Sequence, residues 1–206
     1  MNAEIQTAHD DLAFMRALVD AGENAHAPFG EGYLAAGLVY GAQMLAQAAQ
    51  AAGWLSMRPL AGIALGLGPT VVFLIVLVWI LRRHRRARVV GLVAKATGSV
   101  FGAAGIANLA LAAVIGSVAW RHHSWAIWLI YPCAVFILQG AAWLMVFALR
   151  RRAWLCWVGV GWFIAAIAMG LSVDSLPQYI LAAGLGFLVL MVVPGAVMIR
   201  LSRREA

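Results

Sequence analysis

The pattern of apolar and polar positions divides the chain into a polar start and six long apolar segments. The apolar segments cover about residues 33–54, 60–81, 97–119, 125–149, 153–172 and 179–199. Each is close to the ~20 residues that an α-helix needs to cross a lipid bilayer. The pattern therefore predicts an all-α polytopic membrane bundle of six transmembrane helices, which pair in chain order into three hairpins.

The composition agrees with this prediction, since 64% of the residues are hydrophobic and 11% are charged. Soluble domains have roughly 45–50% apolar and about 25% charged residues. We therefore expect the lipid bilayer to be the main partner of the chain.

Basic residues gather at alternate ends of the apolar segments. The loops after the first, third and fifth segments carry only Arg58, Arg121 and the acid Asp174. The regions after the second, fourth and sixth segments are rich in basic residues, namely Arg82, Arg83, Arg85, Arg86, Arg88, Lys95, Arg150, Arg151, Arg152, Arg200, Arg203 and Arg204. Because basic loops stay in the cytoplasm, the asymmetry predicts a multi-pass protein of the bacterial inner membrane with both termini in the cytoplasm.

Membrane topology also accounts for the net charge of +7, so the basic character is no argument for direct nucleic-acid binding.

Residues 1–32 are predicted to form a cytoplasmic acidic amphipathic helix and a linker. Thr7 is a suitable N-cap, Gly22 a suitable stop, and Pro28-Phe29-Gly30 is expected to break the chain before the first span. The transmembrane domain then covers 33–199, and 200–206 is a cytoplasmic tail. The apolar face of the helix consists of Leu12, Met15, Leu18 and Val19.

That apolar face needs a cover, and its acidic polar side is repelled by anionic lipid headgroups. Two surfaces can supply the cover: the basic inner mouth of the bundle or a cytoplasmic protein partner. The sequence leaves both open.

The first apolar segment carries an unusual row of polar side chains. Gln43, Gln47 and Gln50 follow a helical spacing, and Tyr40 lies on the same arc. An amide that faces lipid leaves its donors and acceptors unpaired, so this face is expected to turn inward. It either forms interhelical hydrogen bonds, with Asn108 and Gln139 as natural partners, or lines a polar cavity.

Small residues at helical spacing indicate close helix packing within the bundle. The pairs are Gly37 and Gly41, Gly62 and Gly66, and Gly98 and Gly102.

The sequence contains no familiar catalytic pattern, such as His-Glu-x-x-His or Gly-x-Ser-x-Gly. His122 and His123 could share a metal, but Asp174 is their only further candidate ligand. Cys133 and Cys156 are predicted to differ in depth by roughly 20 Å and so to be free thiols. We therefore expect no enzymatic activity, no metal and no cofactor.

The stretch from Asp11 to Leu45 contains Asp-Leu-Ala-Phe-Met-Arg-Ala-Leu-Val, Pro-Phe-Gly-Glu and Tyr-Leu-Ala-Ala-Gly-Leu-Val-Tyr-Gly. It resembles the start of a group of uncharacterised six-helix inner-membrane proteins of alphaproteobacteria. Such proteins often accompany a small winged-helix regulator. The resemblance implies no activity and no functional residues, but it favours a regulatory role.

Two functional hypotheses follow from the sequence. In the first, the chain is a non-enzymatic sensor or anchor whose N-terminal helix engages a cytoplasmic partner. In the second, it is a small transporter or channel-like binder of a polar solute that uses the glutamine face. Both are compatible with a homo-oligomer.

The topology can be tested by labelling single cysteines placed beside Arg88 and beside Ser124, in a background that lacks Cys133 and Cys156. With an impermeant thiol reagent on intact cells, we expect the site beside Ser124 to be labelled and the site beside Arg88 to be protected. The reverse pattern would overturn the predicted orientation.

Overall fold

A computed structural model describes residues 26–84 and 92–204, and every regular element in these two ranges is a helix. The expected all-α class is therefore confirmed for the described part of the chain. The predicted docking face of Leu12, Met15, Leu18 and Val19 lies outside the described residues. The elements are α2 (His26–Ala51), α3 (Pro59–Arg83), α4 (Leu92–Arg121), α5 (Trp125–Arg150), α6 (Ala153–Leu171), α7 (Leu176–Phe187), the π-helical turn η1 (Leu188–Val192) and α8 (Val193–Arg204).

Local signals mark both ends of α5. Ser124 caps α5 by accepting a hydrogen bond from the backbone N–H of Ile127 at 3.5 Å, and Arg151 ends α5 in a left-handed conformation with φ of 51°. The expected break at Pro28-Phe29-Gly30 is wrong, because α2 already begins at His26. Pro28 lies in the first turn, where a missing backbone N–H removes no intrahelical bond.

The last three elements follow one another without a break and form one long final helix, from Leu176 to Arg204. It widens into a π-helical turn at Leu188–Val192, immediately before Pro194. A proline inside an α-helix lacks the N–H donor, and its ring collides with the carbonyl four residues earlier. The wider π turn relieves this conflict, so the helix continues through Pro194. The helix also extends into the predicted tail of residues 200–206.

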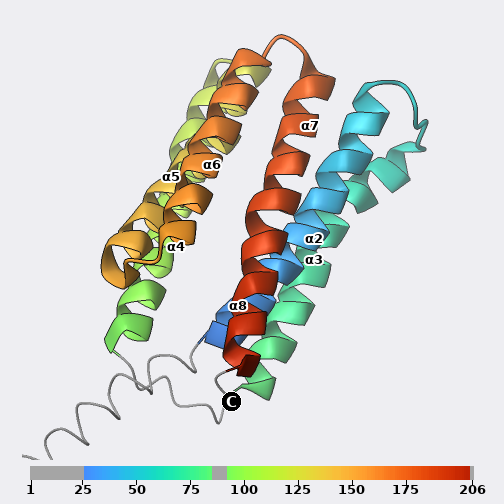
Figure 1. Cartoon of the computed structure of the whole chain (residues 1–206). Helices are drawn as coiled ribbons and strands as arrows, with labels where there is room; N and C mark the ends of the chain where they lie inside the picture. Colours follow the sequence, from blue (N-terminus) through green and yellow to red (C-terminus); the bar gives the residue numbers. More distant parts are fainter. Residues whose placement is uncertain (1–25, 85–91, 205–206) are drawn as a thin grey trace, which may run out of the picture.

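The helices stand side by side in two groups (Figure 1). One group consists of α4, α5 and α6, and the other of α2, α3 and the final helix. The most extensive contacts join α5 to α6 and α2 to the final helix, while α6 and α7 connect the two groups. The three-hairpin layout is not confirmed, because α2 packs more extensively on the final helix than on α3.

Five of the described helices are long and apolar enough to cross a membrane. These are Pro59–Arg83, Lys95–Arg121, Trp125–Arg150, Ala153–Leu171 and Leu176–Arg203. Such helices are compatible with a multi-pass integral membrane protein. The expected count of six is not confirmed, because α2 is not among them. Glu31 and the three glutamines reduce the hydropathy of α2.

Two glycines of α2 allow its backbone to approach the final helix closely. A Cβ atom on Gly37 would lie 2.6 Å from Met191 Cβ and 2.9 Å from the backbone nitrogen of Val192. A Cβ on Gly41 would lie 2.7 Å from the side chain of Leu188. The final helix contributes Gly195, where a Cβ would lie 2.7 Å from the backbone nitrogen of Leu34. We call this contact the glycine seam.

The other predicted glycine pairs do not form close contacts among the described residues. A Cβ atom added to Gly66, Gly98 or Gly102 would have no neighbour within 4 Å, and one on Gly62 would meet only the Gln50 amide nitrogen, at 3.9 Å. Of the three glycine pairs that the spacing predicted to pack closely, only Gly37 and Gly41 do so among the described residues. The final helix is the neighbour that makes Gly37 and Gly41 different.

Aromatic side chains fill the space between the two groups of helices. The indole Nε1–H of Trp143 in α5 donates a hydrogen bond of 2.6 Å to the Tyr33 hydroxyl of α2. Phe101 of α4 packs edge-on against Trp143, with ring centroids 5.4 Å apart. Both Tyr33 and Trp143 are buried. This contact satisfies two polar groups within an apolar core and ties α2 to α5.

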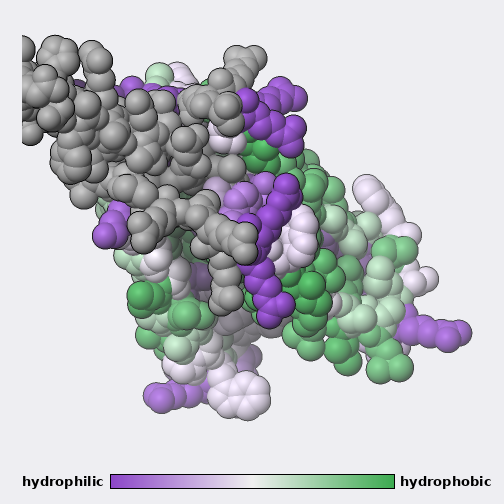
Figure 2. Space-filling model, turned by 90° about the horizontal axis from the view of Figure 1, so that it is seen from below, coloured by the Kyte–Doolittle hydropathy of each residue, from purple (hydrophilic) through white to green (hydrophobic). Residues whose placement is uncertain are grey.

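The basic ends of the helices gather at one end of the bundle. Arg82 and Arg83 end α3, Arg150 ends α5, and Arg200 lies near the end of α8. Figure 2 views the bundle from this end and shows several groups of hydrophilic side chains among hydrophobic ones. The alternation that the sequence predicted is therefore present in the fold.

The glycine seam can be tested by replacing Gly37→Leu. The new Cβ would meet backbone atoms of the final helix. We therefore expect a lower thermal unfolding midpoint in detergent and a free energy of unfolding that is reduced by about 1–3 kcal/mol. Gly102→Leu is the matched control, since its site on α4 is open. Equal unfolding midpoints for the two variants would show that the seam is not closely packed.

Candidate functional site

The glutamine face of α2 turns from the interior toward the surface along the helix. Gln43 is 7% exposed, Gln47 is half-buried, and Gln50 is exposed. The face is therefore not inward along its whole length. Gln43 is the one glutamine of this face that is buried within the bundle.

Gln43 binds the neighbouring helix α3 through its amide group. Its Nε2–H donates to the backbone carbonyl of Gly66 at 3.1 Å. Pro69 lies inside α3 in the next turn and has no backbone N–H, so the carbonyl of Leu65 lacks its usual helical donor. The side chain of Gln43 thus reaches α3 where the hydrogen-bond ladder of that helix is interrupted.

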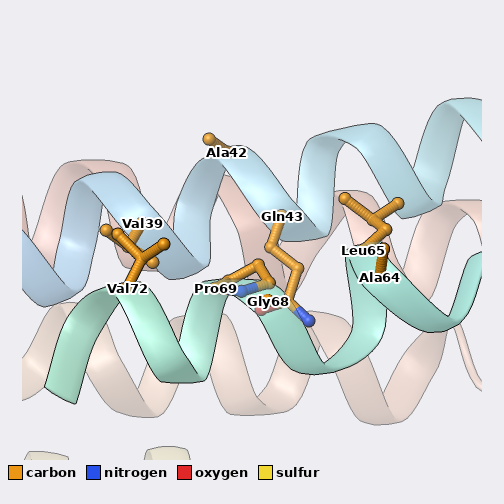
Figure 3. A pocket seen from close by; sticks show the side chains of 8 residues that line it. All are labelled: Val39, Ala42, Gln43, Ala64, Leu65, Gly68, Pro69 and Val72. Atoms are coloured by element: carbon orange, nitrogen blue, oxygen red, sulfur yellow. The ribbon is translucent and has the colours of Figure 1, made fainter. Parts of the chain in front are cut away.

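A groove of about 420 Å³ lies between α2 and α3 at this level. Figure 3 shows the Gln43 side chain extending from α2 across to α3, between Pro69 and Gly68 on one side and Leu65 and Ala64 on the other. The eight lining residues are Val39, Ala42, Gln43, Ala64, Leu65, Gly68, Pro69 and Val72. Apart from Gln43, these residues have apolar side chains or none.

The second polar atom of the Gln43 amide is unsatisfied. Oε1 is buried and accepts no hydrogen bond from any residue that the structure describes. A buried acceptor without a donor costs about 1–3 kcal/mol relative to its hydrated state. A donor group supplied to this atom would recover part of that free energy.

Three contacts at different depths hold α3 against α2. At the basic end, His84 Nε2 lies 3.2 Å from the Glu31 carboxylate. Near the middle, the rings of Tyr40 and Phe73 lie 5.5 Å apart, and the Gln43 bond follows beyond them. Among the residues of α3, Ile80 alone is buried. This helix is therefore attached along one narrow line.

The other predicted partners of the glutamine face make different contacts. Asn108 of α4 accepts a hydrogen bond of 3.0 Å from the Tyr131 hydroxyl of α5. Gln139 of α5 has a buried Oε1 with no partner among the described residues. No hydrogen bond found in the described part of the chain joins either residue to Gln43. The Tyr40 ring packs between Phe73 and Phe187, whose centroid lies 6.1 Å away.

The remaining chemical candidates do not assemble into a second site. Cys133 and Cys156 are free thiols, as predicted, and Cys133 Sγ lies 3.6 Å from the Tyr179 hydroxyl. His122 and His123 are exposed. Within residues 26–84 and 92–204, no group of three or more His, Cys, Asp or Glu side chains could hold a metal ion.

Sequence reasoning missed two contacts between α2 and α3. The Glu31–His84 pair could have been found, because the two residues lie at the basic end of consecutive helices. The carbonyl of Gly66 carries no sequence signal, although Pro69 indicates an interrupted ladder nearby. Which carbonyl of α3 faces Gln43 depends on the rotation of α3 about its axis.

No family model, no curated protein and no solved structure matches this chain.

Proposed function

We propose that the chain is a non-enzymatic sensor or anchor of the bacterial inner membrane, with both termini in the cytoplasm. In this proposal the bundle resides in the membrane, and the N-terminal segment engages a cytoplasmic protein partner through Leu12, Met15, Leu18 and Val19. The basic ends of α3, α5 and α8 lie on one side of the bundle and support the orientation, because basic residues stay in the cytoplasm.

The observation that carries the proposal is the 3.2 Å contact between the Glu31 carboxylate and His84 Nε2. Glu31 lies in the second turn of α2, shortly after the N-terminal segment, and His84 ends α3. A shift of the narrowly attached α3 would therefore act on the part of α2 that leads into the partner-binding segment. This connection is what a membrane sensor needs to pass a change in its bundle to a cytoplasmic protein.

The proposal includes α2 as a sixth membrane-crossing helix. Its 26 residues extend about 39 Å, which exceeds the ~30 Å hydrocarbon core. The final helix covers one side of α2, and α3 covers another. Because neighbours cover Gln43 and part of Gln47, α2 does not require the hydropathy of a helix that faces lipid on most sides.

A second candidate function is the binding or passage of a small molecule at the glutamine face. The specific observation in its favour is Gln43, a buried amide with one unsatisfied atom beside a groove. The two candidates are compatible, because a ligand at this groove could be the signal that the sensor detects.

The partner hypothesis can be tested by replacing Leu12, Met15 and Val19 with Ser in the full-length protein. Affinity purification from native membranes should then lose a soluble partner that the wild-type protein retains, because the apolar docking face is gone. Recovery of the same partners in the same amounts would contradict the hypothesis.

The connection between α3 and the partner-binding segment can be tested with the variant Glu31→Gln. Asp174→Asn, at the opposite end of the bundle, is the control. A partly exposed polar contact of this kind contributes at most about 1 kcal/mol, so partner recovery should change by up to about fivefold with Glu31→Gln. It should stay constant with Asp174→Asn. Equal recovery of the partner with both variants would show that the contact of α3 with Glu31 does not affect partner binding.

A further inference from the structure

We propose that the groove between α2 and α3 binds an uncharged, membrane-soluble molecule with an apolar body and one hydrogen-bond donor, such as a hydroxyl group. The inference deepens the proposed function and rests on it for the role of this molecule as the signal. Binding itself depends only on the groove.

The lining of the groove selects an apolar and uncharged body. Val39, Leu65 and Val72 supply aliphatic surface, and Ala42 and Ala64 leave room between them. No charged side chain lies among the lining residues, so an ionic ligand would remain unpaired in an apolar wall. A volume of about 420 Å³ falls within the range of small-molecule sites.

The Gln43 amide selects a ligand that donates a hydrogen bond. Its Nε2 already donates to the Gly66 carbonyl, whereas Oε1 lacks a donor in the described part of the chain. A ligand hydroxyl or amide N–H can supply that donor. An ether or ester group cannot, because it only accepts hydrogen bonds. The acyl chains of ordinary phospholipids can therefore enter the groove without satisfying Gln43.

Access to Oε1 couples ligand binding to the position of α3. The atom is covered in this structure, so a ligand reaches it by widening the groove. The α3 wall can give way here, because Pro69 interrupts its hydrogen-bond ladder and Ile80 is its one buried residue. A ligand that favours the wider groove shifts the population of α3 toward that position. The Glu31–His84 pair lies at the end of the same helix.

The test compares two probes that differ in one donor. The first is a twelve-carbon primary alcohol with a mid-chain diazirine, and the second is its methyl ether. Both are added to the full-length protein in nanodiscs of phosphatidylcholine, a lipid without hydrogen-bond donors. Photolabelled peptides are then identified by mass spectrometry as a function of probe concentration. We expect saturable labelling of α2 and α3 with the alcohol at about fivefold lower concentration than with the ether, the ratio that one net hydrogen bond provides.

Three variants make the result decisive. Gln43→Met keeps the shape of the side chain and should abolish the preference for the alcohol. Ala64→Phe should fill the groove and remove saturable labelling by both probes, whereas Ala113→Phe on the exposed face of α4 should leave it unchanged. Should Gln43→Met fail to fold, the wild-type comparison and the two phenylalanine variants still decide.

The proposal is overturned if the alcohol and the ether label the wild-type protein equally, or if labelling follows lipid exposure over all helices. It is also overturned if the preference for the alcohol persists in folded Gln43→Met. Partner recovery is a separate measurement. If the partner test fails and the labelling result holds, the protein binds the ligand but does not signal through a cytoplasmic partner.

Discussion

The close approach of α2 to the final helix is the constraint on which the rest of the bundle depends. Gly37 and Gly41 remove side chains where Met191 and Leu188 must fit, and Gly195 does the same opposite Leu34. Because the contacts recur every three to four residues on both helices, they form a continuous antiparallel seam of the coiled-coil type. In lipid, where the hydrophobic effect adds little between helices, such packing is a main source of association.

The seam also explains how α2 tolerates its polar residues. With one side fixed against the final helix, α2 turns Tyr33 toward Trp143 and Gln43 toward α3. Each of these polar side chains thereby finds a partner within the bundle. The groove at Gln43 is then a consequence of packing. One side of α2 is covered by the final helix, so α3 contacts only the part of α2 that the final helix leaves uncovered.

The sequence predicted the features that depend on local chemistry. Basic residues and Ser124 mark the ends of α5, so the predicted 125–149 closely matches Trp125–Arg150. The gathering of the arginines at one end follows from the alternation of segments. The start of α2 was missed because Pro28 can either break a helix or occupy its first turn, and the sequence pattern supports both.

The candidate site could be predicted only in part, because its residues depend on the rotation of each helix about its axis. The spacing of Gln43, Gln47 and Gln50 identified a polar face. The three side chains differ in burial because α3 and the final helix do not cover α2 equally along its length. The same reason separates Gly37 from Gly98, since both have the small-residue spacing and only one meets a neighbour. Asn108 and Gln139 were expected near Gln43, but Asn108 pairs with Tyr131.

The seam joins the first described helix to the last, and this has a consequence for the order of assembly during synthesis. When α2 leaves the ribosome, the helix that covers Gly37 and Gly41 has not yet been made. Contacts between such distant parts of a chain form late, because the intervening segments must be placed first. The nascent protein therefore carries the polar α2 without its main neighbour until Leu176–Arg204 has been synthesised. Completion of the final helix is the event that closes the bundle.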